Sequence, residues 1–159
     1  MPRPGGGHLR SSNPHKLAHL PAALVTATSL DQAVAPPPFE QFRRWIANTQ
    51  TEEVAREFFA DLVCESGRAY CEAAFPFLDR GKATTVNFAA VTTPVLVIRG
   101  EYDRAIVPQV PQWTAARYQR GAYVDIPRSD HLVFFGDALP VTMGHIDDWI
   151  ARNHVLAIT

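Results

Sequence analysis

An apolar run closed by glycine, PVLVIRG at residues 94–100, predicts a β-strand that is buried on both faces. Pro108 and Pro111 then suit the first turn of a helix that ends near Gly121. A second strand is expected at residues 122–126, and an amphipathic helix at residues 141–150. Strand, helix, strand and helix in this order indicate βαβ units, so the fold class is α/β with at least three parallel strands and flanking helices.

Residues 39–78 are predicted to be helical, and they stand between two segments with strand character. Apolar residues recur on one helical face from Phe39 onward. Thr49, followed three residues later by Glu52, fits a capping box at the start of a second helix. Ser66-Gly67 is expected to separate that helix from a third, short one.

The first forty residues contain a segment that we expect to be disordered, a short apolar run and a run of prolines. Residues 1–18 are rich in glycine and proline and have almost no periodic apolar positions, so we expect them to be disordered. The short apolar run at residues 22–28 is consistent with a buried parallel strand, and Pro36, Pro37 and Pro38 then end regular structure. One folded domain is therefore expected at residues 19–159.

Charge and cysteine usage narrow the possible partners and the compartment. The net charge of −1 comes without long runs of one sign, so neither nucleic acid nor a membrane is expected as a partner. No apolar run approaches the length of a transmembrane helix. Cys64 and Cys71 have neither redox nor zinc spacing, and free thiols in a reducing, cytoplasmic setting are the simplest interpretation.

Polar residues follow both strands of the last third. Asp103 follows the first strand and His131 the second, 28 residues apart. Functional groups of open parallel sheets gather beyond the carboxyl ends of the strands, so we expect the two side chains above the same sheet edge. A carboxylate on one imidazole nitrogen fixes the tautomer and stabilises the imidazolium formed in proton transfer.

Other roles remain open for the same residues. Asp103 also suits a turn or helix cap, and His131 a surface loop. Glu101, Asp103, Asp130 and His131 would alternatively suit a hard metal ion if they converged. Ser29 follows the predicted amino-terminal strand, but a turn serine is the commoner interpretation.

These segments resemble two motifs of the α/β-hydrolase family. Residues 93–104 with the Val107-Pro108 step resemble the segment that carries the triad acid, and residues 126–131 resemble the histidine loop. The resemblance extends over residues 22–152 and implies a partial α/β-hydrolase fold, in which the helices at 39–79 stand where the family has its cap or lid. It implies that Asp103 orients His131, and that His131 acts as general base and acid in hydrolysis of an ester, amide or related bond.

The chain departs from the family pattern at the nucleophile. The family expects G-x-S-x-G upstream of the acid, and none occurs here. Asp130 stands where a glycine is common before the histidine. We therefore expect the chain to be inactive alone, with a small-molecule ester or amide as substrate only when it is completed, and with no cofactor and no bound metal.

Three interpretations remain: a truncated hydrolase product, a subunit completed by a second chain, or a non-catalytic binding module. An exposed sheet edge would favour a complementing chain or a homo-oligomer.

Overall fold

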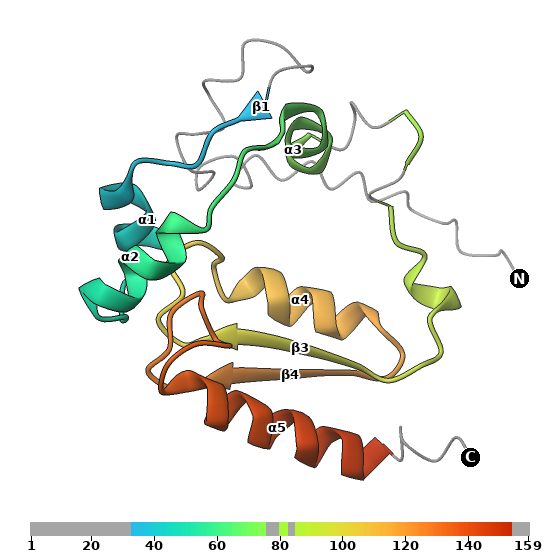
Figure 1. The fold of residues 1–159 in the computed structure, drawn as a ribbon. Coiled ribbons are helices and arrows are strands. Elements are labelled where there is room, and N and C mark those ends of the chain that lie inside the picture. The colour runs from blue at the N-terminus through green and yellow to red at the C-terminus, as the bar shows by residue number, and fades with distance from the viewer. Residues whose placement is uncertain (1–32, 76–79, 83–84, 154–159) are drawn as a thin grey trace, which may run out of the picture.

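The computed structural model of the 159-residue chain describes residues 33–75, 80–82 and 85–153. At its centre two parallel strands lie side by side, with one helix on each face (Figure 1). These elements are β3 (Val95–Gly100), α4 (Gln109–Arg117), β4 (Gly121–Ile126) and α5 (Ala138–Asn153). The predicted alternation of strand and helix in the last third is confirmed.

The parallel pair forms because two short apolar segments can be joined only by a crossover, which α4 supplies. β3 and β4 pair in register along their whole length, from Val95 opposite Gly121 to Gly100 opposite Ile126. Ile126 is fully buried. Matched ends place the loops that follow both strands at the same edge, which is where functional side chains were expected.

Gly100 marks a close approach at that edge. A Cβ atom added there would lie 1.9 Å from the backbone oxygen of Asp130 and 2.5 Å from that of Ser129. Contacts this short do not occur, so the end of β3 and the loop after β4 can touch only because residue 100 has no side chain.

Three helices precede the parallel pair along the chain. They are α1 (Phe39–Trp45), α2 (Glu52–Ala60) and α3 (Gly67–Ala74). Figure 1 shows α1 and α2 beyond the carboxyl ends of β3 and β4. The expectation of three helices is confirmed as far as residue 74, and residues 76–79 lie outside the described part of the chain.

The start of α2 corrects the predicted capping box. Its N-cap is Thr51, whose side chain accepts a hydrogen bond of 3.3 Å from the amide of Val54. Thr49 lies before the helix and uses its own amide for a different contact, described below. The predicted N-cap, Thr49, was therefore wrong by two residues. Threonine is a favourable capping residue at either position, so the sequence alone does not distinguish Thr49 from Thr51. The predicted break before α3 is confirmed, because Ser66 caps that helix through the amide of Ala69.

Aromatic rings join α1 and α2 to the rest of the fold. The buried core here contains Phe42, Ala47, Ala55 and Leu132, with further phenylalanines packed against it. The rings of Phe58 in α2 and Phe135 lie 4.8 Å apart in an edge-to-face arrangement. Since Leu132 and Phe135 lie one and four residues after His131, the histidine loop shares its core with the two helices.

A second, very short sheet lies apart from the parallel pair. β1 (Ala33–Val34) pairs antiparallel with β2 (Glu65–Ser66). Within the described ranges the parallel sheet has two strands, where at least three were expected. The strand predicted at residues 22–28 and the segment 1–18 predicted to be disordered both lie outside the described residues.

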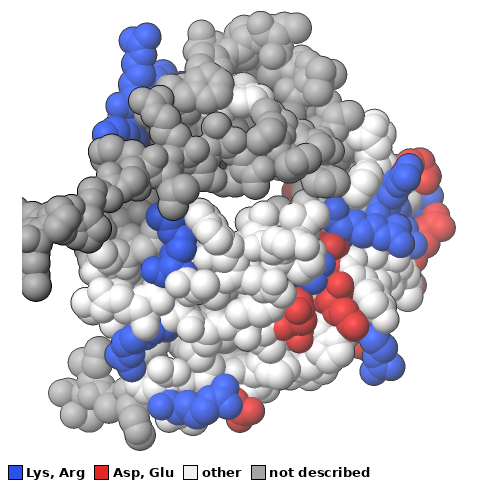
Figure 2. Space-filling model, turned by 180° about the vertical axis from the view of Figure 1, so that it is seen from behind, with Lys and Arg blue, Asp and Glu red and all other residues white. Residues whose placement is uncertain are grey.

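Acidic and basic side chains mix on the face drawn in Figure 2, as the composition leads one to expect. Among the described helices, none is long and apolar enough to cross a membrane. Cys64 and Cys71 are both free thiols.

Candidate functional site

Two loops meet beyond the carboxyl ends of β3 and β4. The amide of Glu101 donates to the oxygen of Ile126 at 2.9 Å, and the amide of Tyr102 donates to that of Ser129 at 2.8 Å. These bonds prolong the strand pairing into the loops and hold residues 101–103 beside residues 129–131. The two residues predicted to form a site, Asp103 and His131, are thereby brought together.

The Asp103 carboxylate and the His131 imidazole form a direct hydrogen bond. Asp103 Oδ2 lies 2.9 Å from His131 Nδ1. The aspartate side chain is only 4% exposed, whereas the histidine side chain is 42% exposed. The acid is therefore fixed inside the fold, and the imidazole it holds remains accessible.

Asp103 is held in place by more than this bond. Its Oδ1 accepts from the amide of Ala105 at 2.7 Å and from that of Ile106 at 3.0 Å, so the carboxylate also closes its own turn. Its backbone oxygen accepts from the Arg99 guanidinium at 2.9 Å. The turn role considered as an alternative and the histidine contact are thus both present, one on each carboxylate oxygen.

Arg99 helps to hold Asp103 in place, and the sequence analysis missed this contact. It lies within the apolar run of β3, where it is 7% exposed, and it also pairs with Asp125 at 3.0 Å. The guanidinium donates further to the backbone oxygen of Ile106. A charged residue inside a strand predicted to be buried was the available signal, because such a residue needs partners nearby.

The pairing perturbs the pKa of both groups. Burial raises the pKa of Asp103, but the hydrogen bonds from His131 and from the amides of Ile106 and Ala105 outweigh it and leave the pKa below its ordinary value. The hydrogen bond to Asp103 raises the pKa of His131 above its ordinary value, against the opposing effect of burial. The negative charge of Asp130 acts in the same direction.

Asp130 links the histidine loop to the connection between α1 and α2. Its side chain is fully buried, and its Oδ2 accepts from the amide of Thr49 at 2.8 Å. Its Oδ1 accepts from Gln50 Nε2 and from the amide of Leu132, both at 3.0 Å. Sequence reasoning considered Asp130 as a replacement for a common glycine and as a possible metal ligand, and it missed this role.

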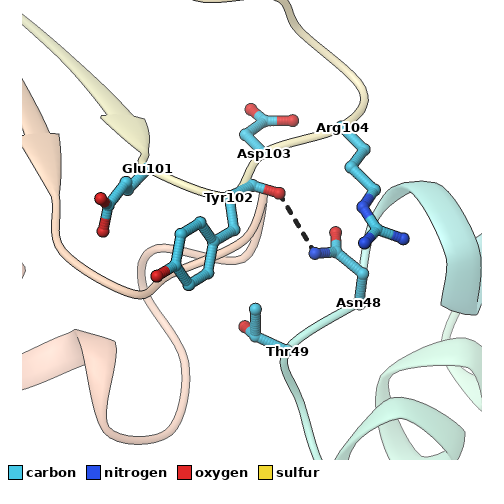
Figure 3. A pocket seen from close by; sticks show the side chains of 6 residues that line it. All are labelled: Asn48, Thr49, Glu101, Tyr102, Asp103 and Arg104. Carbon is cyan, nitrogen blue, oxygen red and sulfur yellow. Dashed lines mark hydrogen bonds between the residues drawn. The ribbon is translucent and has the colours of Figure 1, made fainter.

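A cavity of about 490 Å³ lies between the α1–α2 connection and the loop after β3. Figure 3 shows its six lining residues: Asn48, Thr49, Glu101, Tyr102, Asp103 and Arg104. One wall is the α1–α2 connection and the other is the loop after β3. Asn48 Nδ2 donates to the backbone oxygen of Tyr102 at 3.1 Å and so links the walls directly. Asn48 Oδ1 is buried and has no hydrogen-bond partner in the described structure.

The metal alternative requires convergent ligands, and the carboxylates are engaged elsewhere. Glu101 accepts from the amide of Arg128 at 2.8 Å, and Asp130 is turned toward Thr49 and Gln50. In the described residues no group of three or more potential ligands comes together.

Neither serine of the described ranges is placed as a nucleophile. Ser66 caps α3, and Ser129 is 2% exposed with its hydroxyl directed at the oxygen of Asp130. Ser29 lies outside the described residues.

Comparison with known proteins yields no relative to guide assignment: no family model, no curated protein and no solved structure matches the chain. Geometry and chemistry alone therefore bear on its function. An exposed imidazole whose Nδ1 is bound to a buried carboxylate can accept a proton at Nε2 and return it, which is the general base and acid role.

Proposed function

We propose that Asp103 and His131 are the acid and the base of a serine-hydrolase triad, and that the nucleophile comes from a complementing polypeptide segment. The observation that carries the proposal is the 2.9 Å bond between a buried carboxylate and Nδ1 of an accessible imidazole. The substrate would carry an ester, amide or related bond.

The bonding pattern supports distinct roles for the two residues. With Nδ1–H donated to Asp103, the neutral imidazole keeps its lone pair on Nε2, where a serine hydroxyl would be deprotonated. Both oxygens of Asp103 are occupied by donors, so the carboxylate cannot turn away when His131 becomes charged. The bond stabilises the imidazolium that forms as the nucleophile attacks.

In this proposal the added segment extends the sheet. Within the described residues the parallel sheet contains only β3 and β4, and a partial α/β-hydrolase sheet would gain its further strands beside them. The helices α1 to α3 would serve as the cap, and the 490 Å³ cavity would form part of the substrate site.

The test combines gene context with a covalent probe. DNA preceding the codon for Met1 is translated in all three frames, and any segment with G-x-S-x-G is expressed with the chain, fused or as a partner. We expect a fluorophosphonate to label the serine of the completed protein, forming a serine–phosphorus bond and releasing fluoride. The chain alone should remain unlabelled.

Variants of the completed protein then test whether Asp103 and His131 are responsible for ester turnover. His131→Ala should reduce ester turnover on the order of a millionfold, and Asp103→Asn on the order of ten-thousandfold. His145→Ala is the matched control, because His145 lies within α5, outside the two loops that carry Asp103 and His131, and its loss should leave turnover unchanged. Turnover that survives His131→Ala would refute the assignment. Absence of any labelling segment would instead favour a non-catalytic module.

A further inference from the structure

The cavity between the α1–α2 connection and the loop after β3 has fixed walls. The α1–α2 connection, which forms one wall, is bonded to the histidine loop through Asp130 and to the other wall through the bond from Asn48 to the backbone of Tyr102. Its volume of about 490 Å³ lies in the range of sites that hold small molecules. A cavity whose walls are cross-linked in this way can select a ligand without first being ordered by it.

Three charged residues line this cavity, and the side chains of two of them are already hydrogen-bonded within the protein. The Asp103 carboxylate is bound to His131 and to two backbone amides. Glu101 accepts from the amide of Arg128, and Figure 3 shows its carboxylate turned away from Asn48 and Thr49. Both carboxylates keep their negative charge, but their oxygens are directed at donors of the protein and not at the Asn48 and Thr49 wall.

Arg104 is the third, and it has neither an ion pair nor a hydrogen bond from its side chain to any described residue. It is exposed, and in Figure 3 its guanidinium extends toward the wall that carries Asn48 and Thr49. The Thr49 side chain lies on that wall and can add a hydroxyl donor. A free guanidinium fork beside a hydroxyl matches the two oxygens of a carboxylate.

We propose that this cavity binds the free carboxylate of the substrate through Arg104, so that the substrates are small half-esters of dicarboxylic acids. The specificity rests on the proposed hydrolytic function, because Arg104 directly follows Asp103. Asp103, which is bonded to His131, is itself a lining residue of this cavity, so the ester end of a short half-ester held by Arg104 would lie beside the Asp103–His131 pair.

Binding can be measured on the whole 159-residue chain without turnover. Monomethyl succinate, which has one carboxylate, and dimethyl succinate, which has none, are titrated separately while backbone amide shifts are followed by NMR. We expect monomethyl succinate to shift the amides of Asn48, Thr49 and Arg104 and to bind about tenfold more tightly than the diester. The preference should shrink with added salt, because Arg104 is exposed.

Two arginine variants identify the group responsible. Arg104→Gln should abolish the preference for the half-ester, whereas Arg120→Gln, which removes the same charge just before the start of β4, should preserve it. Equal binding of both esters by the unaltered chain, or a preference that survives Arg104→Gln, would overturn the proposal. Failure of the hydrolytic function would be seen separately, as labelling or turnover that does not depend on His131.

Discussion

Replacing Asp130 with alanine should destabilise the fold, because its carboxylate joins the α1–α2 connection to the histidine loop. The carboxylate is fully buried and accepts three hydrogen bonds, from Thr49, Gln50 and Leu132. Its loss removes the polar link between the α1–α2 connection and the histidine loop. The two regions would then be held together mainly by ring contacts such as that between Phe58 and Phe135.

The size of the effect follows from the donors left behind. A buried donor without an acceptor costs about 1–3 kcal/mol. The amide of Leu132 belongs to a buried residue and loses its acceptor fully, while Thr49 is exposed enough for water to replace part of the loss. Gln50 can turn its amide toward solvent. We therefore expect Asp130→Ala to lower the free energy of unfolding by about 2–4 kcal/mol, a large share of the 5–15 kcal/mol typical of a domain.

Urea denaturation followed by circular dichroism measures this loss, and hydrogen exchange of the Thr49 amide reports whether the link itself has opened. Asp148→Ala is the control, because Asp148 is an exposed position on α5 where a change within about 0.5 kcal/mol is expected. Asp130→Asn keeps one acceptor oxygen, so its free energy of unfolding should lie between those of the Asp130→Ala and Asp148→Ala variants. If Asp130→Ala were as stable as the Asp148 variant, the carboxylate would not hold these regions together and the reasoning would fail.

Further predictions concern the ion pair and the contact at Gly100. Asp103→Asn should lower the pKa of His131, measured from its imidazole NMR signals, because the hydrogen bond that raises it is weakened. In the unaltered protein the stability from His131 should be complete below its ordinary pKa of 6.5 and be lost as pH rises through the raised value. The lowered pKa of Asp103 predicts a second loss as pH falls below about 4, and urea titrations across pH would show both. Gly100→Ala should prevent or distort folding, since its methyl group would lie 1.9 Å from the backbone oxygen of Asp130. In Gly144→Ala on α5 the added methyl group meets no atom within 4 Å, so thermal melts should show a fold more stable by about 0.5–1 kcal/mol.

The parallel pair could be predicted from sequence because its signals are local and agree with one another. The apolar run before Gly100, the prolines at the start of α4 and the short second run each indicate one element, and only a crossover joins two parallel strands. From that topology the meeting of Asp103 and His131 followed, because both come directly after a strand. The predicted pair is therefore a consequence of chain order and strand length.

The contacts that complete the site were beyond such reasoning. Thr49 and Thr51 both suit a helix cap, and only the position of Asp130 in space decides that the amide of Thr49 is used elsewhere. Asp130 lies about eighty residues along the chain from its partners on the α1–α2 connection, and no local sequence pattern predicts a contact over that separation. Arg99 gave a signal, a charge inside a buried run, but not the identity of its partners.

The Asp103 carboxylate is positioned by contacts within residues 99–131 of the chain. Arg99, the amides of Ala105 and Ile106, and the bonds between the two loops fix Asp103 without any group from α1 or α2. The α1–α2 connection instead forms the far wall of the cavity and is fastened through Asp130. Changes in that connection should therefore alter which ligands bind, while the bonds that hold the Asp103 carboxylate in its turn stay in place. Changes in β3 or β4 should disturb both, because the two loops keep their positions only while Gly100 and Ile126 remain paired.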